Sequence, residues 1–545
     1  MNGAAYLIRF LKNKNVDTVF GYPGATLLQV YEELEHSGIR HILMRHEQGC
    51  IHAACGYAKA SGRVGVCLAT SGPGATNLVT GIADASLDSV PLLVVTGQVM
   101  SDHIGRDAFQ EADIMGITIP VTKHNFLVKT PDRLAKCLEE GWNIADSGRK
   151  GPVLVDITRD VFECDFNHSP PLKIAYPRPR ANSFLLSSAF SDLKREWESA
   201  RRPILLAGGG VIGGSGEEDM YSFLRASGIP LVTTLMCKGI VPPSGVDYLG
   251  MVGMFGDMRA NRALDAADLV IASGIRFSDR TIPDFQDFSR RHRVFHNDID
   301  QAEIGKNVRA DGAAVCDSGV FFRALIEEDF PASFCNRGGW ENQLPPVEKG
   351  RYIPPSDRLS CREILESINR IGKKRGGQIY VTDVGNHQMS AALELENLVK
   401  RGFITSGGLG VMGFCLPAAI GASLVDRQED RIVALCGDGG FQMTLQETAS
   451  LRYAGKPIKL FVFDNGELGM IEKMQKRKFG KSGFASTLDG NPDFCLLAEA
   501  YGIASIRLDV SSRMHLDEKI GSILEEDGHV LVHCVTSEKT EENGF

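Results

Sequence analysis

The sequence predicts an α/β protein built from three doubly wound parallel-sheet domains. Short apolar runs rich in valine, isoleucine and leucine alternate with helical segments, as in PLLVVTG, LVIASG and IKLFVFDN. Continuous apolar strands of this kind suit a parallel sheet that helices cover on both faces. With 545 residues, the chain is also longer than one hydrophobic core usually supports, which indicates about three domains.

Two proline-rich stretches break this alternation of strands and helices. One is NHSPPLKIAYPRPRANS near residues 167–183, and the other runs over 336–357. Segments rich in proline are typical of linkers between domains. We therefore expect an N-terminal domain over 1–166, a central domain over 184–335 and a third domain over 357–545.

Composition and charge exclude several classes of function. A formal net charge of −9 argues against a nucleic-acid binder, which needs clustered positive charge. No apolar run approaches the roughly 20 residues that span a bilayer, so we expect no membrane association. The 13 cysteines include no C-x-x-C pair, and the chain opens with neither a signal peptide nor a transit segment. These features indicate a cytoplasmic protein.

The clearest chemical motif lies at the ends of two strands in the third domain. The run RIVALCGDGG leads into a helix, and 24 residues lie between its GDG and the DN that ends the next run, IKLFVFDN. That spacing fits one helix and one parallel strand, so both polar ends meet at the carboxyl edge, where open α/β sheets bind ligands. Asp438 and Asn465 could then share Mg²⁺. The glycines of this motif, Gly437, Gly439 and Gly440, would let backbone N–H groups approach a diphosphate. The alternative is an ordinary strand-to-helix turn with a capping aspartate.

This GDG and the asparagine that follows it resemble the diphosphate and metal motif of thiamine-diphosphate enzymes. The resemblance implies that the metal is held by Asp438, Asn465 and the main-chain carbonyl of Glu467. The usual motif ends in two asparagines. Here Asp464 occupies the first position, and the second, which supplies the ligand, is intact.

The resemblance extends over nearly the whole chain and narrows to the catalytic subunits of acetohydroxyacid (acetolactate) synthases. Its blocks include GYPGATLLQVYEEL, MRHEQGCIHAACGYAKASG, ATSGPGATNLVTGIADA, DAFQEADIMGIT, SGGLGVMGFCLPAAIGA and GDGGFQMTLQE. It implies a carboligase that decarboxylates pyruvate and transfers the hydroxyethyl unit to a second 2-oxo acid. The product would be 2-acetolactate or 2-aceto-2-hydroxybutyrate, on the route to valine and isoleucine.

Five residues match positions that activate or hold the thiamine cofactor in that family. Glu47, in RHEQG, corresponds to the carboxylate that shares a proton with the aminopyrimidine ring. Gly410 and Met412 correspond to a carbonyl that meets the 4′ amino group and a side chain that forces the cofactor to bend. Asn386 and His387 correspond to a pair that contacts the diphosphate. Taken alone, Glu47 would more often be a helix cap, Met412 core filling and His387 a structural histidine.

The substrate pocket is implied by three further matches and left open by two departures. Phe109 and Gln110 resemble residues that line the pocket, and Arg276 resembles the arginine that takes the carboxylate of the second oxo acid, a task suited to a guanidinium fork. Met474 stands where the family carries a tryptophan that shapes the acceptor pocket. Arg159 stands where lysine is usual. The identity of the acceptor is therefore open.

A flavin site in the central domain is implied chiefly by resemblance. The segment GGGVIG fits a G-x-G-x-x-G pattern but lacks an acidic residue about 20 positions further on, so the pattern alone is weak. The family's central domain binds FAD that takes no redox part. The matching positions are Gly208, Thr233, Leu235, Met254, Gly274, Asp298 and Asp317. The alternative is a central domain that binds no flavin, as in some relatives.

Glu47 lies in the predicted N-terminal domain and the GDG motif in the third domain. The resemblance implies an active site formed between two subunits, hence a homodimer or tetramer, with a regulatory small subunit as a further partner. A related thiamine-diphosphate decarboxylase, lyase or specialised carboligase is the nearest alternative function. A noncatalytic cofactor-binding subunit is a more distant one.

Overall fold

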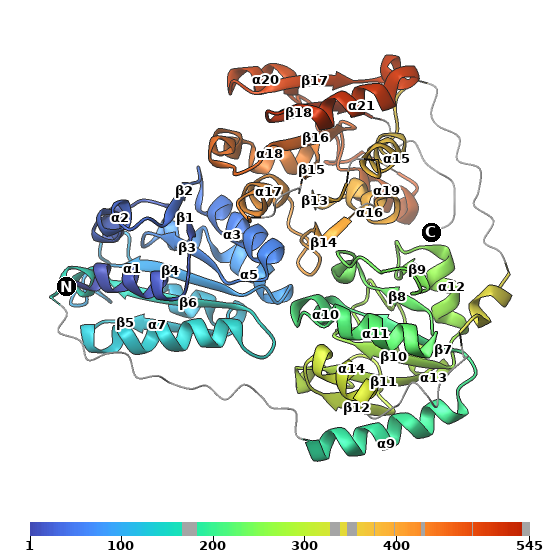
Figure 1. Ribbon diagram of the computed structural model, residues 1–545. Helices are drawn as coiled ribbons and strands as arrows, with labels where there is room; N and C mark the ends of the chain where they lie inside the picture. Colours follow the sequence, from blue (N-terminus) through green and yellow to red (C-terminus); the bar gives the residue numbers. More distant parts are fainter. Residues whose placement is uncertain are drawn as a thin grey trace. The chain divides into compact units, whose positions relative to one another are not determined.

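The computed structural model describes residues 1–165, 183–327, 338–345, 357–374, 376–396, 398–426, 431–481 and 483–536. Most of both predicted linkers lies outside these ranges. The described strands form three six-stranded sheets whose strand pairs are parallel (Figure 1). The predicted fold class is confirmed. Among these residues, no helix has both the length and the apolar character that crossing a membrane requires.

The N-terminal sheet has the strand order β2-β1-β3-β4-β6-β5. Its strands are β1 (Thr18–Tyr22), β2 (Arg40–Leu43), β3 (Gly65–Ala69), β4 (Leu92–Gln98), β5 (His124–Val128) and β6 (Pro152–Thr158). The accompanying helices are α1 (Gly3–Asn13), α2 (Leu28–Glu35), α3 (Glu47–Ser61), α4 (Pro73–Thr76), α5 (Val79–Leu87), α6 (Ile114–Thr118), α7 (Pro131–Asp146) and α8 (Arg159–Glu163). Every residue of β3, β4 and β6 is buried, which explains their unbroken apolar runs.

The central sheet has the order β12-β11-β10-β7-β8-β9. Its strands are β7 (Pro203–Ala207), β8 (Leu231–Thr233), β9 (Tyr248–Met251), β10 (Leu269–Ser273), β11 (Arg293–Asp298) and β12 (Gly312–Val315). The helices are α9 (Ser183–Ser199), α10 (Gly209–Gly213), α11 (Glu217–Ser227), α12 (Met258–Ala266), α13 (Phe285–Arg291) and α14 (Ser318–Glu327). Leu269 and Ile271 enter one hydrophobic cluster while Val270 and Ala272 enter another, so β10 is covered on both faces.

The C-terminal sheet has the order β14-β13-β15-β16-β18-β17. Its strands are β13 (Gln378–Thr382), β14 (Leu398–Ile404), β15 (Arg431–Gly437), β16 (Ile458–Asp464), β17 (Ala504–Leu508) and β18 (Val530–Val535). The helices are α15 (Cys361–Gly372), α16 (Asn386–Glu394), α17 (Cys415–Ser423), α18 (Asp438–Met443), α19 (Gly469–Phe479), α20 (Phe494–Ala500) and α21 (Leu516–Glu525). The GDG and DN motifs thus follow two neighbouring strands, β15 and β16.

The three sheets belong to two compact units, one holding the N- and C-terminal sheets and the other the central sheet. Inside the first unit, α3 packs closely on α17. A Cβ atom added at Gly56 would collide with the carbonyl oxygen of Ala418, and one at Gly421 with that of Ala53. Because the two backbones touch where side chains are missing, glycine is required at both positions. The exact domain boundaries proposed above stay a prediction.

We expect the replacement Gly56→Ala to destabilise this unit by about 1–3 kcal/mol, because the added methyl group would push α3 away from α17. Urea unfolding followed by tryptophan fluorescence and far-UV circular dichroism measures the effect. Gly528→Ala is the matched control, because a Cβ atom there meets nothing within 4 Å. Equal stability of the two variants would contradict the proposed requirement for glycine.

Candidate active site

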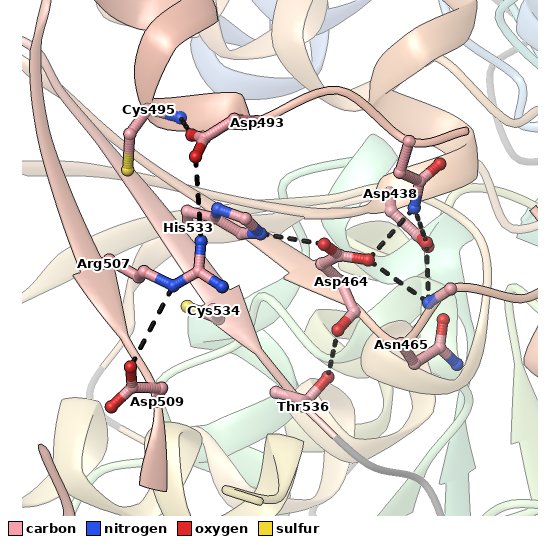
Figure 2. A network of polar contacts seen from close by, with 12 residues as sticks. Asp438, Asp464, Asn465, Asp493, Cys495, Arg507, Asp509, His533, Cys534 and Thr536 are labelled. Carbon is pink, nitrogen blue, oxygen red and sulfur yellow. Dashed lines mark hydrogen bonds and ion pairs between the residues drawn. The ribbon is translucent and has the colours of Figure 1, made fainter. Parts of the chain in front are cut away.

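The ends of β15 and β16 bring the two predicted metal ligands into one loop region. Gly437 pairs with Phe463 across the strands, so Asp438 and Asp464 follow side by side. Asp438 is 2% exposed, and its carboxylate accepts hydrogen bonds from the backbone N–H of Gly466 at 3.0 Å (Figure 2). Burial raises the pKa of Asp438 to about 6. A buried carboxylate of this kind would gain from pairing with a cation.

The same loop region also holds the other two predicted ligands, Asn465 and Glu467. The side-chain oxygen of Asn465 accepts a hydrogen bond from the backbone N–H of Glu467 at 3.3 Å. The backbone of the next residue, Leu468, donates to the carbonyl of Ser486 at 2.7 Å, which fixes the loop from its far side. Oxygen donors held in this way suit Mg²⁺.

Sequence reasoning missed Asn491, which joins the two strand ends. Its side-chain amide donates to the carboxylates of Asp438 at 2.7 Å and Asp464 at 3.0 Å. Asn491 lies in the loop before α20, far along the chain from both aspartates and at no regular spacing from them. Only the fold could reveal this contact.

Asp464, which stands where the family usually has asparagine, finds a partner in a second residue that sequence reasoning missed. His533 of β18 is 3% exposed and hydrogen bonds the Asp464 carboxylate through Nε2 at 2.8 Å (Figure 2). Burial acts to raise the pKa of Asp464, but the hydrogen bonds from His533 and Asn491 outweigh it, and the pKa is lowered. A histidine inside the otherwise apolar run HVLVHCV was the available signal.

His387, predicted to contact the diphosphate, lies against the GDGG turn. It follows β13, the neighbour of β15, and its ring stacks on Phe463 with centroids 6.0 Å apart. A Cβ atom at Gly437 would lie only 3.2 Å from the ring. Burial lowers the pKa of His387 to about 4, so the ring is neutral. Its buried Nε2 has no hydrogen-bond partner among the described residues, which fits a polar ligand. Asn386 begins the same helix, α16.

Asp383, at the end of β13, is a third residue that sequence reasoning missed. Its buried carboxylate accepts hydrogen bonds from the backbone N–H of Gly413, 3.0 Å from each oxygen. A Cβ atom at Gly440 would lie 2.8 Å from the same carboxyl group. Burial raises the pKa of Asp383 to about 7. Asp383 thus ties the GVMG loop to the end of β13 and leaves no room for a side chain in the GDGG turn.

That loop carries Gly410 and Met412. Gly410 has φ +74°, a left-handed conformation that favours glycine. The terminal methyl group of Met412 lies 3.5 Å from the point where a Cβ atom at Gly439 would stand. The structure therefore brings Met412 and the GDGG turn together.

Glu47 is the first residue of α3, and its carboxylate accepts a hydrogen bond from the side chain of Asn77 at 2.9 Å. The SGPG turn lies beside it: a Cβ atom at Gly74 would lie 3.3 Å from Glu47, and one at Gly72 would lie 2.7 Å from the backbone of Gln110. The first sheet therefore gathers Glu47 and Gln110 around one turn. Within the described residues, Glu47 makes no hydrogen bond to the GDGG turn.

The remaining pocket residues are less closely grouped. Phe109 is 87% exposed, and Gln110 has φ +60°, so this loop presents an aromatic ring to solvent in a single chain. Arg276 follows β10 in the second compact unit, and its backbone carbonyl accepts a hydrogen bond from Asn307 at 3.1 Å. The position of Arg276 relative to Phe109 stays a prediction.

Most of the predicted flavin positions follow the carboxyl ends of strands in the central sheet. Gly208 follows β7 and packs on Gly274, which has φ +61° and follows β10, so the glycines are already required by the packing of two turns. Three side chains have partners in the protein: Thr233 bonds Tyr248 at 3.0 Å, Asp298 accepts from Asp300 at 2.9 Å and Asp317 accepts from Gly319 at 2.9 Å. Leu235 and Met254 are partly exposed.

Three family models match, one in each of the three sheet-containing parts of the chain. They are described as the thiamine pyrophosphate enzyme N-terminal TPP binding domain (residues 1–117), central domain (195–325) and C-terminal TPP binding domain (383–534). An acetolactate synthase of Mycobacterium leprae is 43% identical over 522 residues, covering 93% of this chain and 83% of the relative. The acetolactate synthase isozyme 2 large subunit of Escherichia coli is 39% identical over 542 residues, covering 99% and 96%. The chain belongs to the acetolactate synthase family.

A probable acetolactate synthase large subunit of Methanocaldococcus jannaschii is 40% identical over 519 residues, covering 93% of this chain and 88% of the relative. The predicted family is therefore confirmed across bacterial and archaeal members. The match to both TPP binding domains makes this chain a thiamine-diphosphate enzyme, as predicted.

The two departures from the acetolactate synthase pattern are both accessible in the single chain. Met474 lies on α19 and is 50% exposed. Arg159 begins α8 and pairs with Glu163 at 2.7 Å, with both side chains partly exposed. Neither side chain is buried in the core.

Proposed function

We propose that this chain catalyses thiamine-diphosphate-dependent carboligation, joining the hydroxyethyl unit of pyruvate to a second 2-oxo acid. The main product is 2-acetolactate, an intermediate of branched-chain amino-acid biosynthesis. The observation that carries the proposal is the gathering of Asp438, Asn465, His387 and Met412 at one sheet edge in a chain of the acetolactate synthase family. The fold of a family does not by itself fix an activity, whereas these side chains have defined chemical tasks.

The C-terminal sheet holds the charged end of the cofactor. Asp438, Asn465 and the carbonyl of Glu467 would hold Mg²⁺, which would balance the charge of the diphosphate. Backbone N–H groups at the start of α18 and the unpartnered Nε2 of His387 complete the cradle. Asn386 contributes a further hydrogen bond to the diphosphate.

The reactive end of the cofactor is handled by three groups. Bound thiamine diphosphate supplies the nucleophilic carbon and the electron sink for decarboxylation. Glu47 holds the proton at the aminopyrimidine nitrogen, acting as the general acid and base. The carbonyl of Gly410 orients the amino group. Met412 would pack against the cofactor and hold its reacting groups close together.

The substrates meet the side chains at the pocket wall. Phe109 and Gln110 surround the donor, and Arg276 pairs with the carboxylate of the acceptor through a bidentate contact. The positions already named at the edge of the central sheet would hold FAD, which would take no part in electron transfer. Among the described residues Glu47 makes no hydrogen bond to the GDGG turn, which supports a site that a second copy completes by supplying its own Glu47, in a homodimer or tetramer. A regulatory small subunit joins it.

The test uses purified protein with thiamine diphosphate, Mg²⁺, FAD and pyruvate, with and without 2-oxobutyrate. Products are identified by mass spectrometry. We expect 2-acetolactate in both reactions and 2-aceto-2-hydroxybutyrate in the second. Release of acetaldehyde without carboligation would instead identify a decarboxylase. Bound cofactor without turnover of pyruvate would overturn the proposal and favour another donor or a noncatalytic role.

Met474→Trp should shift the acceptor preference toward 2-oxobutyrate. The flexible thioether leaves the pocket wall adaptable, whereas an indole ring would contact the extra methylene of 2-oxobutyrate. One methylene in an apolar pocket discriminates by about 10- to 200-fold. Competition between the two acceptors, followed by product ratio, measures the shift.

Met514→Trp is the control for that experiment, because this methionine is 87% exposed and lies on the segment before α21. It should leave the product ratio unchanged. A ratio that does not move in Met474→Trp would show that α19 does not form the acceptor wall.

A further inference from the structure

Three side chains of kinds that can bind a metal lie together beside the candidate active site, and none of them is a predicted Mg²⁺ ligand. Asp493, Cys495 and His533 each offer one ligand atom, and these atoms lie within 4.8 Å of one another. Asp493 and Cys495 stand at the start of α20, and His533 comes from β18, which this helix contacts. Figure 2 shows the three side chains grouped on one side of Asp464.

The orientation of His533 makes the cluster more than a chance grouping. Its Nε2 bonds the Asp464 carboxylate at 2.8 Å, which leaves Nδ1 as the ring atom that can bind a ligand. This Nδ1 is buried and has no hydrogen-bond partner among the described residues. Figure 2 shows it on the edge of the ring that faces Asp493. A carboxylate that orients a histidine in this way is the usual outer support of a metal ligand.

The neighbours hold the imidazole ring and leave one carboxylate oxygen accessible. The ring of Phe494 meets His533 edge to face with centroids 5.1 Å apart, which fixes the plane of the imidazole. One oxygen of Asp493 accepts hydrogen bonds from the backbone N–H groups of Cys495 and Leu496. The other oxygen faces Arg507 at 3.9 Å. A partly exposed ion pair this long is weak, so a cation can displace the guanidinium.

We propose that Asp493, Cys495 and His533 form a binding site for one zinc-like divalent cation. One nitrogen, one sulfur and one oxygen ligand suit Zn²⁺, which is usually four-coordinate, with water in the fourth position. The thiolate disfavours Mg²⁺, which demands oxygen ligands and keeps its water. The site is therefore chemically distinct from the diphosphate metal site, although His533 reaches that site through Asp464 and Asn491.

The test is a titration of the enzyme, already loaded with thiamine diphosphate and Mg²⁺, with Co²⁺ as a spectroscopic substitute for zinc. We expect a thiolate-to-cobalt charge-transfer band that saturates at one ion per chain. Cys495→Ser should abolish the band, and Cys164→Ser, which changes an exposed cysteine outside the cluster, should leave it unchanged. Zn²⁺ should displace Co²⁺, and Mg²⁺ in excess should not.

Two further variants distinguish Co²⁺ binding at this cluster from nonspecific Co²⁺ binding to the protein surface. Arg507→Gln removes the competing cation and should tighten Co²⁺ binding, whereas Asp464→Asn disturbs the support of His533 and should weaken it by about 10- to 100-fold. Absence of the band in the unchanged enzyme, or its persistence in Cys495→Ser, would overturn the proposal. Because the readout is an absorption band, this outcome is independent of whether carboligation is observed.

Discussion

Glu47→Gln should lower the rate of carboligation by about 100- to 10,000-fold, the range that a positioned general acid and base contributes. Glutamine keeps the size of the side chain and can still accept the hydrogen bond from Asn77, which lies 2.9 Å away. It cannot hold and release a proton. The loss should therefore appear in kcat and in hydrogen–deuterium exchange at the reactive carbon of the cofactor, measured by NMR.

Binding measurements separate this chemical loss from a folding defect. Thiamine diphosphate should bind to Glu47→Gln with nearly unchanged affinity, because the diphosphate and metal are held by the C-terminal sheet. Glu35→Gln, an exposed glutamate at the end of α2, is the control and should keep full activity. If Glu47→Gln kept more than a tenth of the activity, another group would have to supply the proton.

Asp438→Asn should weaken Mg²⁺-dependent binding of thiamine diphosphate by at least about 100-fold. Even the loss of a residue that only hydrogen bonds a metal ligand lowers metal affinity by about 10- to 100-fold. The replacement removes the negative charge at the end of β15 while the side-chain oxygen can still accept from Gly466. Calorimetric titration with the cofactor at fixed Mg²⁺ measures the change, and activity should fall with it.

Asp464→Asn makes the same atomic change one strand away and is the matched comparison. Asp464 bonds His533 through one carboxylate oxygen and Asn491 through the other, and it is not among the predicted ligands; an asparagine, with a single side-chain oxygen, can keep only one of these two hydrogen bonds. We expect cofactor affinity to fall by no more than about tenfold, which is the smaller effect seen when a residue that hydrogen bonds a metal ligand is replaced. Equal losses in the two variants would mean that Asp464 is itself a ligand.

The sequence could predict the parts of the site that follow a local pattern. Unbroken apolar runs predicted the buried strands. The spacing between the GDG and DN motifs predicted one helix and one strand between them. Gly410 and Met412 were found through family blocks. In each case the information lies within a few residues, or in an order of blocks that the fold preserves.

The parts that escaped prediction depend on contacts across the fold. Asn491 reaches two strand ends from a loop, and Asp383 is a buried carboxylate whose partner is the backbone of Gly413. His533 gave a signal, a polar residue in a buried strand, but its partner could not be named. Gly208 shows the reverse case: the glycine was predicted for a flavin, and the structure gives it a packing role against Gly274.

The close packing of α3 on α17 also bears on how the chain is made. The ribosome completes the N-terminal sheet long before α17 exists, because the whole central domain lies between the two helices in the sequence. Until then the glycine-lined face of α3 has no partner. Contacts between such distant segments form late and leave apolar surface open to aggregation. The newborn enzyme would therefore depend on chaperones during synthesis, and overexpression at lower temperature would raise the yield of folded protein.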